Sequence, residues 1–176
     1  MPTSPRRLAR ILALQTLFEV DSVPHDPLPV LQRHLEDNGL TGDAAAFASD
    51  LVEGVWDERD RLDAIIAEAA PSWPMDQMAK VDKNVLRLAI YEVLYDHDVP
   101  LKAAINEAVE LGKRFGSDSS SRFINGVLGT VAAQAQTHRS WRPRPSGRGL
   151  TSPPAVPPSL EGARDLENLE GLGDEL

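Results

Sequence analysis

The sequence contains no cysteine. This absence excludes structural disulfides, zinc sites built on thiolates and cysteine nucleophiles. The residues that are present do not form a glycine-rich phosphate loop, a serine nucleophile elbow or a zinc-binding helix motif. We therefore expect no catalytic activity, no cofactor and no metal, and a chain without disulfides fits the reducing cytoplasm.

Long apolar runs and an excess of positive charge are also missing. No stretch approaches the roughly 20 apolar residues of a membrane span, because Gln15 and Glu19 interrupt the one that follows Arg6 and Arg7. The formal net charge is -9, whereas nucleic-acid-binding domains are usually basic. We expect a soluble protein that does not bind membranes, and any RNA site on its acidic body must be a local patch.

Helical periodicity, in contrast, recurs along the chain, and no long stretch alternates like a strand. Ser4 and Pro5 favour the start of a first helix, and Gly116 stands where a left-handed C-terminal cap is expected. The patterns predict an all-α bundle of about seven helices, with approximate ranges 5–23, 28–38, 41–55, 62–69, 76–95, 101–115 and 117–131.

The composition changes after His138. Six prolines and several glycines follow, and the last sixteen residues carry six acidic side chains and one arginine. Such a segment buries too little apolar surface to offset the entropy of ordering it. We expect one helical domain over residues 1–138 and a disordered tail over residues 139–176.

Three segments carry a resemblance to a known family. They are VPLKAAINEAVELGKRFG and RFINGVLG, within Val81–Gly129, and RRLARILALQTLFEVD, Arg6–Asp21. Together they resemble the NusB family of bacterial transcription antitermination factors, over about residues 4–135. The resemblance implies a helical bundle of two subdomains without catalytic activity. It also implies binding to the boxA element of nascent ribosomal RNA together with the NusE ribosomal protein, in an antitermination complex with RNA polymerase.

A first candidate RNA contact is the arginine-rich start of the chain. Arg6, Arg7 and Arg10 have the i, i+3 and i, i+4 spacing of neighbours on a helix surface. A guanidinium group can form two parallel hydrogen bonds to a phosphate. Binding releases counterions from the RNA, so the affinity depends on salt. Composition alone would favour an ordinary solvated basic face, but the family resemblance favours RNA binding.

A second candidate RNA contact spans the end of the sixth predicted helix and the start of the seventh. Helix N-terminal N–H groups and serine hydroxyls suit phosphates, and an exposed phenylalanine can stack on an unpaired base. The alternatives are a simple helix cap and a phenylalanine in the core. The chain departs from the family pattern at Ser119, where several relatives are acidic, and at Gln77, where an arginine is expected. The candidates are Lys113, Arg114, Ser117, Ser119, Ser120, Arg122 and Phe123.

The family's protein-docking surface maps to the start of the fifth helix, which nominates Asp82, Lys83 and Asn84. An acidic residue there suits a basic ribosomal protein, although a solvated helix face is an equal alternative. The competing function is a helical protein-interaction module, or a homodimer that covers the RNA face without direct RNA binding.

Two other polar groups are interpreted as structural. Asp96, His97 and Asp98 are too close together to converge on one metal ion and fit a solvated loop. Carboxylates such as Glu92 and Glu107 lie on helices expected to pack together, where buried hydrogen bonds are more common than catalysis.

Overall fold

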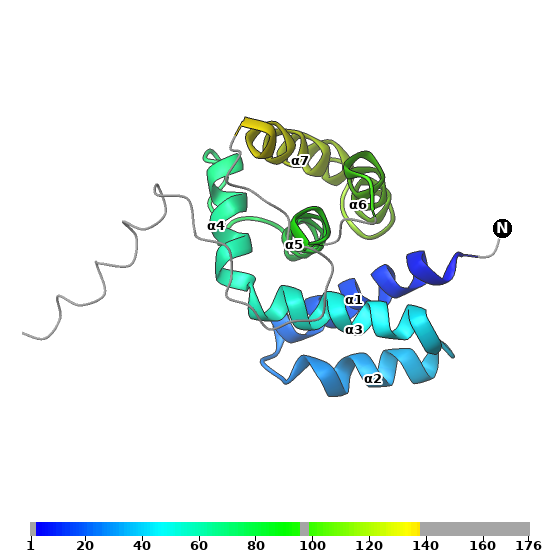
Figure 1. The fold of residues 1–176 in the computed structure, drawn as a ribbon. Helices are drawn as coiled ribbons and strands as arrows, with labels where there is room; N and C mark the ends of the chain where they lie inside the picture. Colours follow the sequence, from blue (N-terminus) through cyan, green and yellow to red (C-terminus); the bar gives the residue numbers. More distant parts are fainter. Residues whose placement is uncertain (1–2, 96–98, 138–176) are drawn as a thin grey trace, which may run out of the picture.

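The computed structural model describes residues 3–95 and 99–137. These residues form seven helices and no strand (Figure 1). This confirms the predicted all-α bundle. The helices are α1 (Pro5–Ser22), α2 (Pro27–Asp37), α3 (Gly42–Asp57), α4 (Arg59–Ala69), α5 (Lys80–Tyr95), α6 (Leu101–Phe115) and α7 (Ser120–Thr137).

The helices divide into two groups around α5. Helices α1, α2 and α3 pack on one another, and α4, α5, α6 and α7 form the second group. Figure 1 shows α5 in the middle, between the layer of α1–α3 and the pair α6 and α7. Because α5 contacts α1 and α3 as well as α4, α6 and α7, it joins the two subdomains that the family resemblance implies.

Helix α1 begins where Ser4 and Pro5 predict a helix start. The Ser4 Oγ accepts a hydrogen bond from the Arg7 N–H at 3.2 Å, and Pro5 occupies the first helical position. The cap satisfies one of the N–H groups that a helix start leaves without a partner. The core is aliphatic, and its largest fully buried side chains include Leu12, Leu51 and Leu86.

Three helix starts and one cap differ from the prediction, and one of these starts is that of α4, which begins at Arg59 instead of residue 62. Helix α5 begins at Lys80, because turn hydrogen bonds such as Gln77 N–H to the Pro74 carbonyl occupy the preceding residues. Helix α7 begins at Ser120, slightly later than predicted. Gly116 is extended, with φ -93° and ψ -165°, and not left-handed. It has no room for a Cβ, which would overlap the Ser120 side chain.

Other expectations concern residues outside the described part of the chain. The loop Asp96, His97 and Asp98 and the whole of the predicted tail, residues 139–176, lie there. Within residues 3–95 and 99–137, no helix has the length and apolar character needed to cross a bilayer. The same residues contain no group of three or more histidine or acidic side chains placed to hold a metal ion.

Candidate functional site

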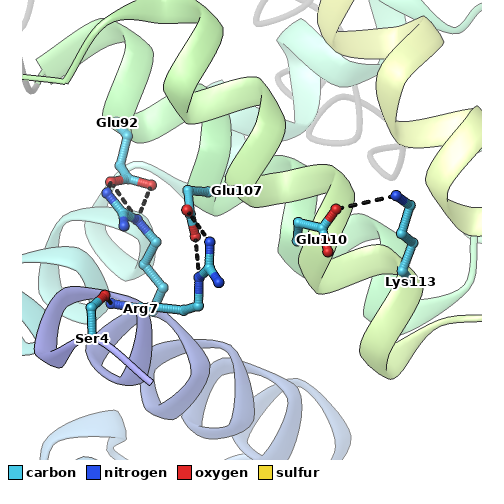
Figure 2. A network of polar contacts seen from close by, with 7 residues as sticks. Ser4, Arg7, Glu92, Glu107, Glu110 and Lys113 are labelled. Atoms are coloured by element: carbon cyan, nitrogen blue, oxygen red, sulfur yellow. Dashed lines mark hydrogen bonds and ion pairs between the residues drawn. The ribbon is translucent and has the colours of Figure 1, made fainter. Parts of the chain in front are cut away.

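The first turns of α1 present two arginines at the surface. The Arg6 guanidinium lies over the Phe47 ring of α3, 4.3 Å from its centre. Arg7 reaches α6, where its Nη2 lies 2.8 Å and its Nε 3.2 Å from the two Glu107 carboxylate oxygens (Figure 2). The hydrogen bond and the opposite charge raise the pKa of Arg7, and they lower the pKa of Glu107.

Arg10 has a different environment. Its side chain is 8% exposed, and its guanidinium hydrogen-bonds both carboxylate oxygens of Glu92 on α5, whose side chain is 3% exposed. The expected surface strip of three guanidiniums is therefore wrong at Arg10, because α5 and the Phe47 ring cover this turn of α1. The expected structural role of Glu92 is confirmed.

A charged face of α6 continues from this contact. Glu107, Glu110 and Lys113 follow one another at three-residue intervals along the helix (Figure 2). The Lys113 Nζ lies 3.1 Å from Glu110, and both side chains are more than half exposed. Since six residues of helix span about 9 Å, this face connects the Arg7 contact with the basic end of α6, Lys113 and Arg114.

The turn between α6 and α7 contains one buried serine, which supports the turn, and several exposed polar residues. Ser120 is 1% exposed, and its Oγ accepts the Ser117 N–H at 2.9 Å, so this hydroxyl stabilises the turn. Ser117, Ser119 and Arg122 are exposed. Of the predicted polar contacts in this turn, Ser120 is the one least able to reach a ligand.

Phe123 is half-buried and contacts an exposed tryptophan. Its ring packs edge-on against Trp73, with 5.8 Å between ring centres and 69° between planes. Trp73 is 54% exposed. Beside the two rings lies a pocket of about 420 Å³, within the usual range of small-ligand sites. Its lining residues are Trp73, Gln77, Met78, Ala79, Asp82, Ser117, Ser119, Arg122 and Phe123.

The start of α5 contributes to this pocket and offers little exposed surface. Asp82 is 8% and Asn84 1% exposed. Asn84 hydrogen-bonds the Lys80 carbonyl at 2.9 Å, and the Lys83 Nζ lies 3.8 Å from Asp21. The nominated docking residues thus do not form an exposed face, since Asp82 lines the pocket and Asn84 is packed inside.

A second, apolar hollow lies on the other side of the α5 start. It encloses about 520 Å³, and two of its lining residues, Phe18 and Val23, are 41% and 52% exposed. We call it the apolar groove. Its lining residues are Leu14, Gln15, Phe18, Glu19, Ser22, Val23, Val81 and Phe115. The groove and the pocket are neighbours, because Val81 lines one and Asp82 the other.

Comparison with known proteins identifies the family. The model of the NusB family matches residues 7–133. The chain belongs to the NusB family. Among its relatives, the transcription antitermination protein NusB of Chloroflexus aggregans is 54% identical over 138 residues, which cover 77% of this chain and 92% of the relative.

The NusB fold is also recognised in solved structures. NusB from T. maritima superimposes with a TM-score of 0.70 at 32% identity, over 76% of this chain and 94% of the other. A structure described as antitermination factors NusB and NusE in complex with double-stranded RNA matches with a TM-score of 0.68 at 24% identity, over 74% and 97%. This second likeness concerns the fold alone.

Sequence reasoning did not find every residue of the site. The sequence patterns do not nominate Trp73, and they nominate Asp82 only for the protein-docking surface. The signal for Trp73 was a large aromatic residue between Pro71 and Pro74, where a loop gives it little chance of burial.

Proposed function

We propose that this NusB-family chain is a transcription antitermination factor. It binds boxA-type single-stranded RNA together with the NusE ribosomal protein, within the RNA polymerase antitermination complex in the cytoplasm, and has no catalytic role. Curated relatives bear the name of transcription antitermination protein. The name of one solved relative describes NusB and NusE in complex with double-stranded RNA.

The observation that carries the RNA proposal is the pocket beside Trp73 and Phe123. An unpaired base can stack on an exposed aromatic ring, and such stacking contributes about 1–3 kcal/mol per base. Arg122 lines the same pocket, and Lys113 and Arg114 end the preceding helix. In this proposal, these cations bind phosphates of the nucleotides next to the stacked base.

The start of α1 forms the other end of the proposed RNA path. Arg6 and Arg7 are exposed, and the charged face of α6 links them to the pocket. Arg10 stays in the proposal as a residue that holds this end in place, since its guanidinium is occupied by Glu92. The RNA would then cross α6 between the two clusters of cations.

The apolar groove is the proposed seat of the protein partner. Asp82, Lys83 and Asn84 sit beside it at the start of α5, while Phe18, Val23 and Val81 supply the apolar surface that a stable protein contact needs. Because the groove adjoins the pocket, RNA and NusE would bind side by side. This arrangement supports joint binding.

A titration tests the function. Fluorescent boxA-type RNA and a scrambled RNA of the same composition are titrated with the full chain, with and without NusE. We expect tighter binding to boxA-type RNA and a further gain when NusE is present. Equal, weak binding to both RNAs, with NusE bound as tightly in the absence of RNA, would instead support a protein-interaction module. A homodimer would be seen by light scattering.

A further inference from the structure

The apolar groove presents aromatic and aliphatic surface next to positive charge. Phe18 and Val23 of α1 are exposed in its wall. At the end of α6, the exposed Arg114 guanidinium lies 5.2 Å from the centre of the Phe115 ring, which also lines the groove. The groove therefore offers apolar contact and a cation at its edge to the molecule that covers it.

The other charges around the groove also favour an acidic occupant. The Lys80 ammonium donates a hydrogen bond of 3.3 Å to the Oγ of Ser22, which lines the groove. The acidic residue of the lining is Glu19, and both of its carboxylate oxygens lie 2.7 Å from the Arg33 Nη2. Because Arg33 compensates the charge of Glu19, the cations at the edge set the sign of the local potential, and complementary charge favours an acidic partner.

Residues 160–176 of the same chain combine leucines with acidic side chains. Leu166, Leu169 and Leu172 follow one another at three-residue intervals. Residues three apart share one side of a helix, and an amphipathic segment can lay such a side into an apolar groove. The segment also carries six acidic residues against one basic residue, Arg164. Its apolar spacing and its negative charge both match the groove.

Residues 138–159, which link this segment to α7, are long enough to allow the contact. Helix α7 begins at Ser120, a short turn after Phe115, and its 18 residues span about 27 Å. Residues 138–159 reach at most about 70 Å when fully extended. The segment can therefore return from the end of α7 to the groove of the same molecule.

We propose that residues 160–176 dock in the apolar groove and occupy it until a protein partner displaces them. The effect on NusE rests on the proposed function, which seats NusE in this groove. A tethered segment acts at an effective concentration of about 1 mM. If the free peptide binds with a dissociation constant on the order of 0.1 mM, about one groove in ten is open, and an added ligand binds about tenfold more weakly.

The test uses the full chain and a fluorescent synthetic peptide of residues 159–176. The triple variant Leu166→Ser, Leu169→Ser and Leu172→Ser keeps every charge of the segment and removes its apolar contacts. It should bind the peptide about tenfold more tightly than the wild type, because its own segment has left the groove. The matched control should bind the peptide as weakly as the wild type. It makes three apolar-to-serine changes in the linking residues, Leu150→Ser, Ala155→Ser and Val156→Ser.

A second pair of variants locates the contact. Both are made in the leucine-substituted chain, where the groove is open to the peptide. Phe18→Ala should weaken peptide binding at least tenfold, because an aromatic contact in the groove is lost. Leu28→Ala should leave it unchanged, since this residue of α2 is about as exposed as Phe18 but does not line the groove. Melting curves check that both variants are folded.

The same leucine-substituted chain links the docking to the protein partner. Its affinity for NusE should exceed that of the wild type about tenfold, because no segment has to leave the groove first. The control with changes at residues 150, 155 and 156 should bind NusE like the wild type. Isothermal titration calorimetry measures both affinities.

The outcomes separate this inference from the proposed function. Equal peptide affinities of the wild-type and leucine-substituted chains, or peptide binding that is indifferent to Phe18→Ala, would overturn docking in the groove. A wild-type affinity for the peptide that changes with protein concentration would place the segment of a second copy in the groove and overturn docking within one molecule. The expected peptide results with an unchanged NusE affinity would support the docking and overturn the proposed seat of NusE. The first comparison changes only residues beyond Thr137, so it does not depend on how a groove variant folds.

Discussion

The contact between Arg7 and Glu107 predicts that one glutamate restrains RNA binding. In the free protein the guanidinium is engaged by the Glu107 carboxylate at 2.8 Å and 3.2 Å. A phosphate that approaches Arg7 must compete with this carboxylate and is repelled by it. The change Glu107→Gln removes the negative charge and keeps the side-chain shape, so it should strengthen RNA binding.

The expected size follows from counterion release. Each phosphate contact on single-stranded RNA contributes about 0.7 to the slope of log affinity against log salt. If Glu107→Gln releases one full contact, a fourfold rise in salt should weaken the variant about 2.6-fold more than the wild type. The affinity of the variant should exceed that of the wild type most clearly at low salt.

Fluorescence anisotropy over a salt series measures both quantities. The matched control is Glu68→Gln, an exposed residue on α4, which Figure 1 shows on the side of the molecule opposite the N-terminus of α1. It makes the same change in net charge away from the proposed RNA path. In an Arg7→Ala background, Glu107→Gln should have no further effect on the slope, because the two residues act as a pair.

Parallel slopes for Glu107→Gln and the wild type would refute this reasoning, as would an equal gain in the control.

Acidification provides a second check on the pair, through stability. Because the pKa of Glu107 is lowered in the folded state, its stabilising contribution is complete above the ordinary glutamate pKa of about 4.3 and is lost as pH falls through the lower folded value. The stability difference between wild type and Glu107→Gln should therefore shrink in that acidic range.

Three further changes test the scaffold and the groove. Arg10→Ala should destabilise the fold by about 3–5 kcal/mol in urea unfolding, because it leaves Glu92 buried without its partner, and should leave the RNA salt slope unchanged. Phe18→Ala should weaken NusE binding by more than about 1 kcal/mol in calorimetry, with little change in melting temperature, since Phe18 is 41% exposed in the groove. Gly54→Ala should lower the melting temperature, because the added Cβ would overlap the Tyr91 ring, and overpacking typically costs about 1–3 kcal/mol.

The sequence was most informative where structure depends on neighbours along the chain. The Ser4 cap, the proline at the helix start and the apolar periodicity are local signals, and all seven helices appear near the predicted positions. Gly116 shows the limit of such signals. A glycine after a helix suggests a left-handed cap, but here it is needed because Ser120 approaches too closely for a Cβ.

The site itself depended on contacts between distant segments. Spacing placed Arg10 near Arg6 on one helix, but it could not reveal that Glu92 on α5 would enclose the guanidinium. In the same way, nothing local to Trp73 indicates that it meets Phe123 on α7. The pocket arises from tertiary packing. The sequence could therefore nominate some of its residues singly, but it could not predict that they line one pocket.

The central position of α5 has a consequence for how the protein unfolds. This helix belongs to the second group by its contacts with α4, α6 and α7, and it also packs against α1 and α3. Loss of α5 would expose apolar surface on both groups at once. We therefore expect neither group to unfold while the other stays folded. We expect heat and denaturant to unfold the described helices in one cooperative transition. A ligand held at the N-terminus of α1 would then raise the melting temperature of the helices at the other end of the molecule.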